Sequence, residues 1–381
     1  MKRAAAERRT PAIAGEDPVE SLRLNLKVIL LLVIGFCTIV IVATRVRSRL
    51  ALITIRSITR GPLRPLTPPL TVDKAGIIAV LRAREFARLD TMFTTLQSAA
   101  EKDVRQEANL ELALEAFKRE DQSIYPLLDE WVKRSPSSYA ASLARAESRS
   151  IRWSKSDYAA VRRDSIAALA LNSKIAEAYA LLIPLHRDDQ YTCESKQQVD
   201  KGLKQSPASF IIRTAEMTCL AEEGGWSDKE LAHIAREAQV HVDENPRLRA
   251  LLGFVDGRRG EVAVEQQRNL AAIAYYTRSI DEGGDDATFY RGRGEALLNL
   301  GRNDEALDDL RRADQLWPQS PDTLQWLAYG LSHDSKNEEA LRALDRDNEI
   351  EGPSSYNQEL RISIIGSMTE KLPRAIGDAG N

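Results

Sequence analysis

Alanines spaced by 34 residues are the feature of this sequence that most restricts its fold. Ala272, Ala306 and Ala340 lie at equal intervals in the C-terminal third of the 381-residue chain. From Thr71 onward there is no sustained alternation of apolar and polar residues, and Ala, Leu, Glu and Arg are frequent, which favours helices over strands. A fixed period of this length indicates that one supersecondary unit is repeated and stacked on itself. We therefore expect an array of helical hairpins.

The segment 287–320 resembles a tetratricopeptide repeat (TPR). Small residues are expected at Gly294 and Ala306 because the two helices of one hairpin cross closely there, and Gly301 suits the turn between them. The same pattern recurs one period earlier and one period later, although Asp347 replaces a small residue in the last copy. The residues that carry the resemblance are Tyr290, Gly294, Leu297, Gly301, Ala306, Leu310, Ala313 and Pro318.

Upstream of residue 253 the repeat is degenerate. Two amphipathic stretches, 74–100 and 104–134, would begin the array, and Ser227 to Glu230 has the pattern of a capping box that opens a helix. The segment 356–371 is a candidate capping helix, which a solenoid needs to cover its last apolar face. Residues that end successive repeats can be placed at Pro136, Ser173, Pro207, Pro246, Gly284, Pro318 and Gly352.

Residues 76–250 also resemble, more loosely, an uncharacterised bacterial domain family that often precedes TPRs. The resemblance rests on the segments 127–141, 176–179 and 224–226. It implies a bacterial source and a helical continuation of the array. It brings no known activity and no functional residues.

A charge-free apolar run at residues 28–44 lies within a basic N-terminal segment. Residues 1–64 contain 12 basic and 4 acidic residues, a balance of +8, and the remaining 41 basic and 52 acidic residues give −11. The run is at the short end of the roughly 17–25 residues that span a membrane, and Lys27 and Arg45 flank it. We predict a transmembrane helix. A cleaved signal peptide and a buried core helix are the alternatives, but the long preceding tail and the arginines that follow the run argue against a signal peptide.

Within twenty residues of the span, four basic residues precede it and six follow it, so the positive-inside count slightly favours a cytoplasmic C-terminal domain. The basic N-terminal tail is itself a poor candidate for translocation, which argues for the opposite orientation. We expect a single-pass protein of the bacterial inner membrane, with the C-terminal domain in the periplasm, which is the default arrangement for an N-terminal anchor. The predicted fold is all-α, a TPR-like α-solenoid of helical hairpins behind a single N-terminal transmembrane helix. The predicted parts are an N-terminal tail (1–27), the transmembrane helix (28–44), a basic and proline-rich linker (45–73), degenerate helical repeats (74–252), TPRs (253–352) and a C-terminal tail with the capping helix (353–381).

No sequence motif points to catalysis or to a cofactor. The glycines at 257–260 and 291–294 lack the Gly-Lys-Ser/Thr ending of a phosphate-binding loop. His233 and His241 are eight residues apart, which places them on one face of a helix, but they lack a zinc-site signature. We therefore predict no enzyme activity, cofactor, metal or small-molecule substrate. The near-neutral net charge argues against nucleic-acid binding.

The TPR resemblance implies a concave groove, formed by the first helix of each repeat, that binds a protein or peptide partner. The Lys and Asn set with which some TPR proteins grip a C-terminal carboxylate is not reproduced here. Together with the apolar run at 28–44 and the looser bacterial resemblance, the TPR resemblance predicts a membrane-anchored scaffold or adaptor in a bacterial envelope complex. The alternatives are a recruiting subunit of an envelope enzyme and a structural assembly factor. The expected groove positions are Arg291, Glu295, Leu298, Asn299, Gln325, Tyr329, Ser332 and His333.

Two of the three cysteines, Cys193 and Cys219, fall on neighbouring helices in the repeat register. A disulfide between them is one expectation if the domain is periplasmic. Two buried thiols are the other, because cysteine pairing cannot be deduced from sequence alone.

Overall fold

The computed structural model describes residues 66–119, 121–151, 155–185, 195–222 and 227–370. All of them belong to one compact unit, Pro65–Asn381. The predicted N-terminal tail, the predicted transmembrane helix at 28–44 and most of the linker lie outside the described residues. Within the described ranges, no helix has both the length and the apolar character needed to cross a membrane.

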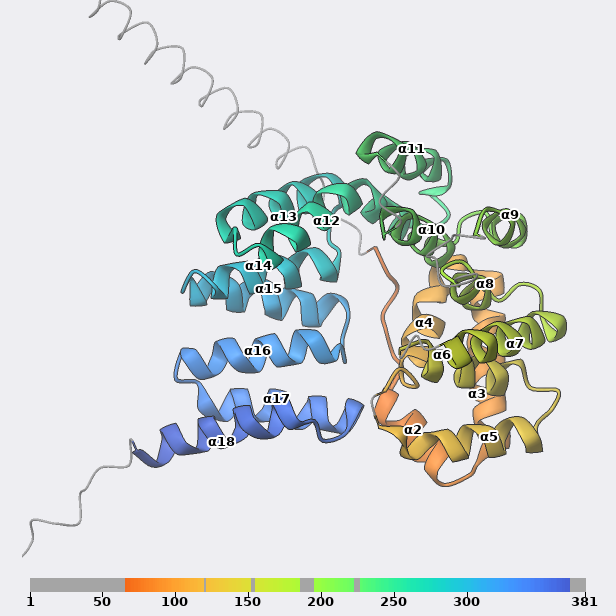
Figure 1. Ribbon diagram of the computed structural model, residues 1–381, viewed down its shortest axis with the longest axis horizontal. Coiled ribbons are helices and arrows are strands. Elements are labelled where there is room, and N and C mark those ends of the chain that lie inside the picture. The colour runs from red at the N-terminus through yellow and green to blue at the C-terminus, as the bar shows by residue number, and fades with distance from the viewer. Residues whose placement is uncertain (1–65, 120, 152–154, 186–194, 223–226, 371–381) are drawn as a thin grey trace, which may run out of the picture. The chain divides into compact units, whose positions relative to one another are not determined.

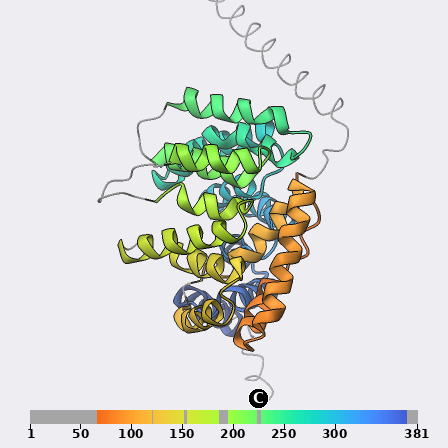
Figure 2. The same ribbon diagram turned by 90° about the vertical axis from the view of Figure 1, so that its right-hand side faces the viewer.

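The described part of the chain is all-α and contains no strand, and most consecutive helices pack against each other as neighbours (Figures 1 and 2). The helices are α2 (Lys74–Arg82), α3 (Phe86–Lys102), α4 (Glu107–Glu115), α5 (Tyr125–Arg134), α6 (Tyr139–Ser150), α7 (Lys155–Leu171), α8 (Ala176–Leu182), α9 (Ser195–Gln205), α10 (Phe210–Glu222), α11 (Asp228–Ala238), the 3-10 helix η4 (Pro246–Gly253), α12 (Phe254–Glu265), α13 (Asn269–Gly283), α14 (Ala287–Leu298), α15 (Asn303–Leu316), α16 (Pro321–His333), α17 (Asn337–Glu351) and α18 (Ser355–Glu370).

The α14–α15 hairpin shows why the repeat needs small residues. A Cβ on Gly294 would lie 2.8 Å from Leu310 Cγ, so any larger residue would displace the second helix. Ala306, on the facing helix, is fully buried. Gly301 has a φ of +72°, a backbone conformation that glycine adopts without steric cost. The close crossing and the turn expected from the sequence are both confirmed.

The two amphipathic stretches at the start of the array each fold into two helices. The first stretch is interrupted between α2 and α3, where Arg84 has a φ of +58°, a left-handed conformation that cannot continue a helix. The second is divided into α4 and α5 by a short 3-10 turn at Gln122–Ile124, in which the Ser123 N–H donates to the Asp121 side chain. The predicted capping box of Ser227 and Glu230 is present at the start of α11.

The last helix, α18, packs against α17 and α16. Asp347 is fully buried at this junction. Its Oδ2 accepts hydrogen bonds from Asn357 Nδ2 of α18 at 2.6 Å and from Gln325 Nε2 of α16 at 3.0 Å. Asp347 is the residue that departs from the small-residue pattern of the repeat. The departure has a structural reason, since the carboxylate joins three helices.

The first helix of the array contacts the turn between α15 and α16, far along the chain. The Lys74 backbone N–H donates to Gln319 Oε1 at 2.8 Å, and Gln319 Nε2 donates to the Val72 carbonyl at 2.5 Å. Trp317 Nε1 donates to Glu115 Oε2 of α4 at 3.2 Å. These contacts bring the N-terminal helices next to the TPR hairpins and so form one wall of the candidate site.

Candidate functional site

A cavity of about 1140 Å³ lies at the N-terminal ends of the first helices of the repeats. Thr288 and Arg291 of α14, Asp322 and Gln325 of α16, and Tyr356 of α18 line one side of it. The opposite wall comes from the N-terminal part of the array and includes Lys74, Glu115 and Lys118. The cavity is thus bounded by helices from both ends of the described chain.

Both signs of charge line this cavity. Lys74 Nζ lies 2.8 Å from Glu115 Oε2, and Arg291 Nη1 lies 3.6 Å from Asp322 Oδ2. Lys118 Nζ lies 3.3 Å from Glu147 Oε2, and this carboxylate raises the pKa of the Lys118 ammonium. The Arg291–Asp322 pair is long and its Asp322 side chain is 68% exposed. Exposed pairs of this kind contribute little to stability, and both side chains line the cavity.

Of the residues expected in the groove, Arg291 and Gln325 line this cavity. Glu295 is half-buried one turn further along α14, and burial raises the pKa of its carboxyl while Arg291 opposes that shift. Gln325 already donates to the buried Asp347. Its amide is therefore held in place by its neighbours.

The expectation for Leu298 is wrong. Leu298 is only 8% exposed and belongs to the apolar core that α14 shares with α16 and α17. A Cβ on Gly330 would lie 3.1 Å from Leu298 Cδ2, which shows how closely α16 approaches it. Leu298 therefore packs between repeats and is not available to a partner.

The other expected groove residues lie towards the C-terminal ends of α14 and α16 and do not line the cavity. The Tyr329 ring lies 4.4 Å from the His333 ring and makes an edge-on contact with Trp326 at 5.9 Å. Ser332 Oγ donates to the Tyr329 carbonyl at 2.7 Å. Asn299 is exposed at the end of α14.

Sequence reasoning missed the residues that the N-terminal helices add to the site, namely Lys74 and Glu115. It also missed Trp317, which lies just after α15, and Tyr356, which lies one 34-residue period after Asp322. Trp317 lies under the guanidinium of Arg247, 4.6 Å from Arg247 Cζ to the ring centre. No repeat period links Lys74 or Glu115 to the other lining residues, so only the tertiary contacts reveal these two.

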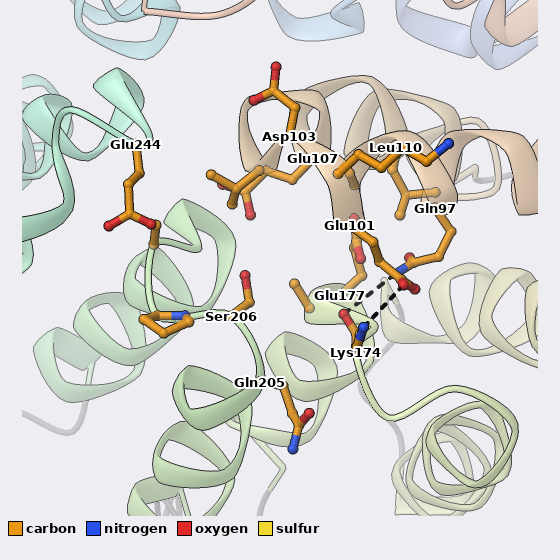
Figure 3. A pocket seen from close by; sticks show the side chains of 16 residues that line it. Gln97, Glu101, Asp103, Glu107, Leu110, Lys174, Glu177, Gln205, Ser206 and Glu244 are labelled. Atoms are coloured by element: carbon orange, nitrogen blue, oxygen red, sulfur yellow. Dashed lines mark hydrogen bonds and ion pairs between the residues drawn. The ribbon is translucent and has the colours of Figure 1, made fainter.

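A second, smaller pocket of about 380 Å³ lies within the N-terminal half (Figure 3). It is bordered by the end of α3, the start of α4, the start of α8 and the α9–α10 turn. Carboxylates predominate in its lining, and Glu101, Glu107 and Glu177 are among the side chains that Figure 3 shows there. It is separate from the cavity at α14, α16 and α18.

Glu107 is a buried carboxylate of this pocket that accepts three hydrogen bonds. It accepts hydrogen bonds from Ser209 Oγ at 2.8 Å, from the Phe210 N–H at 2.7 Å and from Asn245 Nδ2 at 2.7 Å. Burial nevertheless raises the pKa of Glu107 to about 7, against the effect of the nearby Arg247 guanidinium. Its carboxyl therefore changes protonation near neutral pH.

Within the described ranges, no group of three or more His, Cys, Asp and Glu side chains is placed to hold a metal ion. The prediction that His233 and His241 share one helix face is wrong, because α11 ends at Ala238 and His241 lies in the following 3-10 turn. Each imidazole instead faces a carboxylate in its own segment. His233 Nε2 lies 3.3 Å from Glu237 Oε1, and His241 Nδ1 lies 2.8 Å from Glu244 Oε1.

Cys219 lies on α10 and is 1% exposed. It is disulfide-bonded in the structure. Cys193 lies outside the described residues, so the pairing of these two cysteines stays a prediction.

Comparison with known proteins gives one family match. Residues 258–321 match the tetratricopeptide repeat model, a range that contains the hairpin from which the resemblance was drawn. No curated protein sequence matches the chain significantly.

Several solved structures resemble the chain distantly. Yeast Tom70 has 16% identity, with a TM-score of 0.45, over 76% of this chain and 60% of the Tom70 chain. The Cut9–Hcn1 hetero-tetramer of the APC/C gives 14% identity and a TM-score of 0.32, over 74% of this chain and 52% of that one. The TPR2AB domain of yeast Sti1 in complex with pHSP90 gives 20% identity and a TM-score of 0.28, over 77% of this chain and 96% of the Sti1 chain. This chain thus spans about 60% of the Tom70 chain, and these likenesses assign neither a partner nor an activity to it. The described part of the chain is an all-α, TPR-like solenoid whose match to the tetratricopeptide repeat family covers residues 258–321.

Proposed function

We propose that this chain is a scaffold that binds a segment of a partner protein in the cavity at α14, α16 and α18. The observation that carries the proposal is the cavity itself, which is lined by the first helices of the TPR hairpins. Its volume of about 1140 Å³ exceeds the roughly 300–1,000 Å³ that is usual for small-molecule sites. A peptide segment fits a space of this size better than a metabolite does.

The lining suits a peptide that carries both polar and apolar groups. Trp317 and Tyr356 offer aromatic surface, and aromatic residues are enriched where proteins bind each other. Arg291 and Asp322, which hold each other only loosely, can pair with charged side chains of the partner. The binding mechanism is stoichiometric association and needs no chemical step.

The membrane anchor is part of the same proposal. Residues 28–44 would hold the scaffold in the bacterial inner membrane, and the array would face the periplasm as part of an envelope complex. An anchor of this kind confines the search for partners to the membrane surface. The apolar run and its basic flanks, which belong to the sequence, support this part of the proposal.

Site-specific photocrosslinking tests the binding site. A photoreactive phenylalanine derivative at Asp322, in the cavity lining, should capture a reproducible partner from cells. The same group at the exposed Asp308, on the second helix of the preceding hairpin, is the matched control. Arg291→Glu should reduce the captured amount at least several-fold, whereas Arg311→Glu on α15 should not. Equal capture from both positions would contradict a binding site in the cavity.

A topology reporter tests the anchor separately. Alkaline phosphatase fused after residue 381 should be active in a bacterial host, because this enzyme requires the periplasm. Activity of a cytoplasmic reporter at the same position, with an inactive phosphatase fusion, would overturn the proposed orientation and leave the binding site untouched.

A further inference from the structure

The acidic pocket of the N-terminal half contains a buried carboxylate to which no other described residue donates a hydrogen bond. Glu177 is 3% exposed, and no other residue in the part of the chain that the structure describes donates a hydrogen bond to either of its carboxylate oxygens. Only its own backbone N–H faces the carboxylate, and this contact lowers its pKa. Buried polar groups in native proteins nearly always have partners. A carboxylate that lacks them at the wall of a pocket indicates that something else supplies the donors.

A second buried side chain of the same pocket has a free acceptor. Gln97 is 4% exposed, and its Oε1 also has no hydrogen-bond partner among the described residues. Its amide orientation is fixed, because Nε2 donates to Glu101 Oε1 at 3.0 Å and to the Lys174 carbonyl at 3.5 Å, and both partners are acceptors. Three buried acceptor oxygens therefore line the pocket. No buried side-chain donor of its lining is left unpaired.

The charges around the pocket favour a cation. Burial raises the pKa of Glu177, and the carboxylate of Glu107, which also lines the pocket, raises it further. Glu111 and Glu147, which lie outside the lining, act in the same direction. Of the two lysines in the lining, Lys174 has its ammonium 3.5 Å from Glu101, and Lys102 is exposed. Neither supplies a donor to Glu177.

The kind of cation follows from the ligand geometry. The described residues hold no group of three or more metal-ligating side chains, so the pocket does not offer a coordination sphere for a metal ion. An ammonium has three N–H donors and no acceptor, and a guanidinium has five. Such groups match three acceptors that lack donors.

We propose that the pocket formed by α3, α4, α8 and the α9–α10 turn binds an ammonium or guanidinium group, with Glu177 and Gln97 as its acceptors. The group can be carried by a free polyamine or by a lysine or arginine side chain of a polypeptide. The volume of about 380 Å³ lies within the usual range for ligand sites. The proposal does not depend on peptide binding at α14, α16 and α18.

Isothermal titration calorimetry on the full-length protein tests the proposal. The probes are spermidine and agmatine as free cations, and end-blocked Gly-Lys-Gly and Gly-Arg-Gly as side-chain carriers. End-blocked Gly-Gln-Gly is the uncharged control. At least one cationic probe should bind with a Kd below about 1 mM, equivalent to about 4 kcal/mol, and Gly-Gln-Gly should not. Binding by the free amines alone indicates a small-molecule source, and binding by the peptides indicates a polypeptide source.

Two variants separate this site from non-specific attraction to an acidic protein. Glu177→Gln keeps the shape of the side chain and should weaken binding at least tenfold. Glu216→Gln on α10 makes the same change at a largely buried carboxyl outside the pocket and should leave the Kd unchanged. If Glu177→Gln does not fold by circular dichroism, Gln97→Met takes its place and removes one of the acceptors.

Proton release provides a second readout. A cation bound at Glu177 favours its carboxylate form, so binding should release protons, and the measured heat should depend on the ionisation enthalpy of the buffer. Failure of every cationic probe to bind at about 10 mM would overturn the proposal. Unchanged affinity in both Glu177→Gln and Gln97→Met, or equal binding of Gly-Gln-Gly, would overturn it as well.

Discussion

Lys74 and Gln319 form two hydrogen bonds through main-chain and side-chain atoms, although 245 positions separate them in the sequence. The Lys74 N–H donates to Gln319 Oε1 at 2.8 Å, and Lys74 Nζ donates to the Gln319 carbonyl at 2.9 Å. Lys74 is 2% exposed and also forms an ion pair with Glu115. This relationship ties the first helix of the array to the turn that opens α16.

Gln319→Ala should lower the free energy of unfolding by about 1–3 kcal/mol, because it leaves the Lys74 N–H and the Val72 carbonyl without their partner. Alanine is preferred to glycine because Gln319 has a φ of +62°, and glycine would relieve that backbone cost. Urea denaturation measures the change. Gln315→Ala, on the exposed side of α15, is the control and should stay within about 0.5 kcal/mol of the wild type. Equal stability of the two variants would show that the Gln319 contacts do not stabilise the array.

Stability should fall as the pH rises through the range in which Glu107 ionises. Burial raises the pKa of Glu107 from 4.5 to about 7, so between these values the folded state binds more protons than the unfolded state. The stabilising contribution of protonated Glu107 to the folded state is complete below pH 4.5 and is lost as the pH rises through about 7. Burial shifts the pKa of Glu147 in the same direction.

Glu107→Gln should remove part of this pH dependence. Its amide oxygen can still accept from the Phe210 N–H and from Asn245, and its NH₂ group can donate to Ser209. When the pH is raised from about 5 to about 8, the free energy of unfolding of the wild type should fall by roughly 1–3 kcal/mol more than that of Glu107→Gln. Urea denaturation at both pH values measures this, with the exposed Glu282→Gln as control. An identical pH profile in wild type and Glu107→Gln would refute the assignment.

Two glycines in helices should respond in opposite directions to alanine. A Cβ on Gly292 of α14 would lie 2.2 Å from Tyr276 Cζ, whereas a Cβ on Gly366 of α18 would meet nothing within 4 Å. Gly292→Ala should lower the stability by about 1–3 kcal/mol, because the clash outweighs the better helix propensity. Gly366→Ala should raise it by about 0.5–1 kcal/mol through propensity alone. Thermal unfolding of both variants checks the signs, and a stabilised Gly292→Ala would contradict the close helix packing.

Cys193 and Cys219 should form one disulfide in protein purified under oxidising conditions. Peptide mapping by mass spectrometry without reduction should give a linked pair that reductant separates. Removing the bond by Cys193→Ser should lower the stability by about 2–4 kcal/mol under the same conditions. Recovery of both cysteines as thiols that react with an alkylating agent in unreduced, unfolded protein would rule the bond out.

The sequence by itself determined the local architecture of the C-terminal third. The spacing of Ala272, Ala306 and Ala340, together with Gly294 and Gly301, set the hairpins and their turns, because close helix crossings tolerate only small residues. The capping box of Ser227 and Glu230 could also be predicted from the sequence, because it depends on a contact between residues within one helical turn. Features of this kind depend on neighbours within one repeat period.

Only the tertiary structure decided the sites. Leu298 occupies a position expected in the groove, yet the approach of Gly330 buries it, and no pattern within one helix reveals that approach. The wall that Lys74 adds to the cavity arises from contacts across most of the described chain. Glu177 is an ordinary glutamate by sequence, and its lack of donors follows from which helices surround it. Helix periodicity is a short-range property, whereas cavities and unpaired buried groups result from the packing of distant segments.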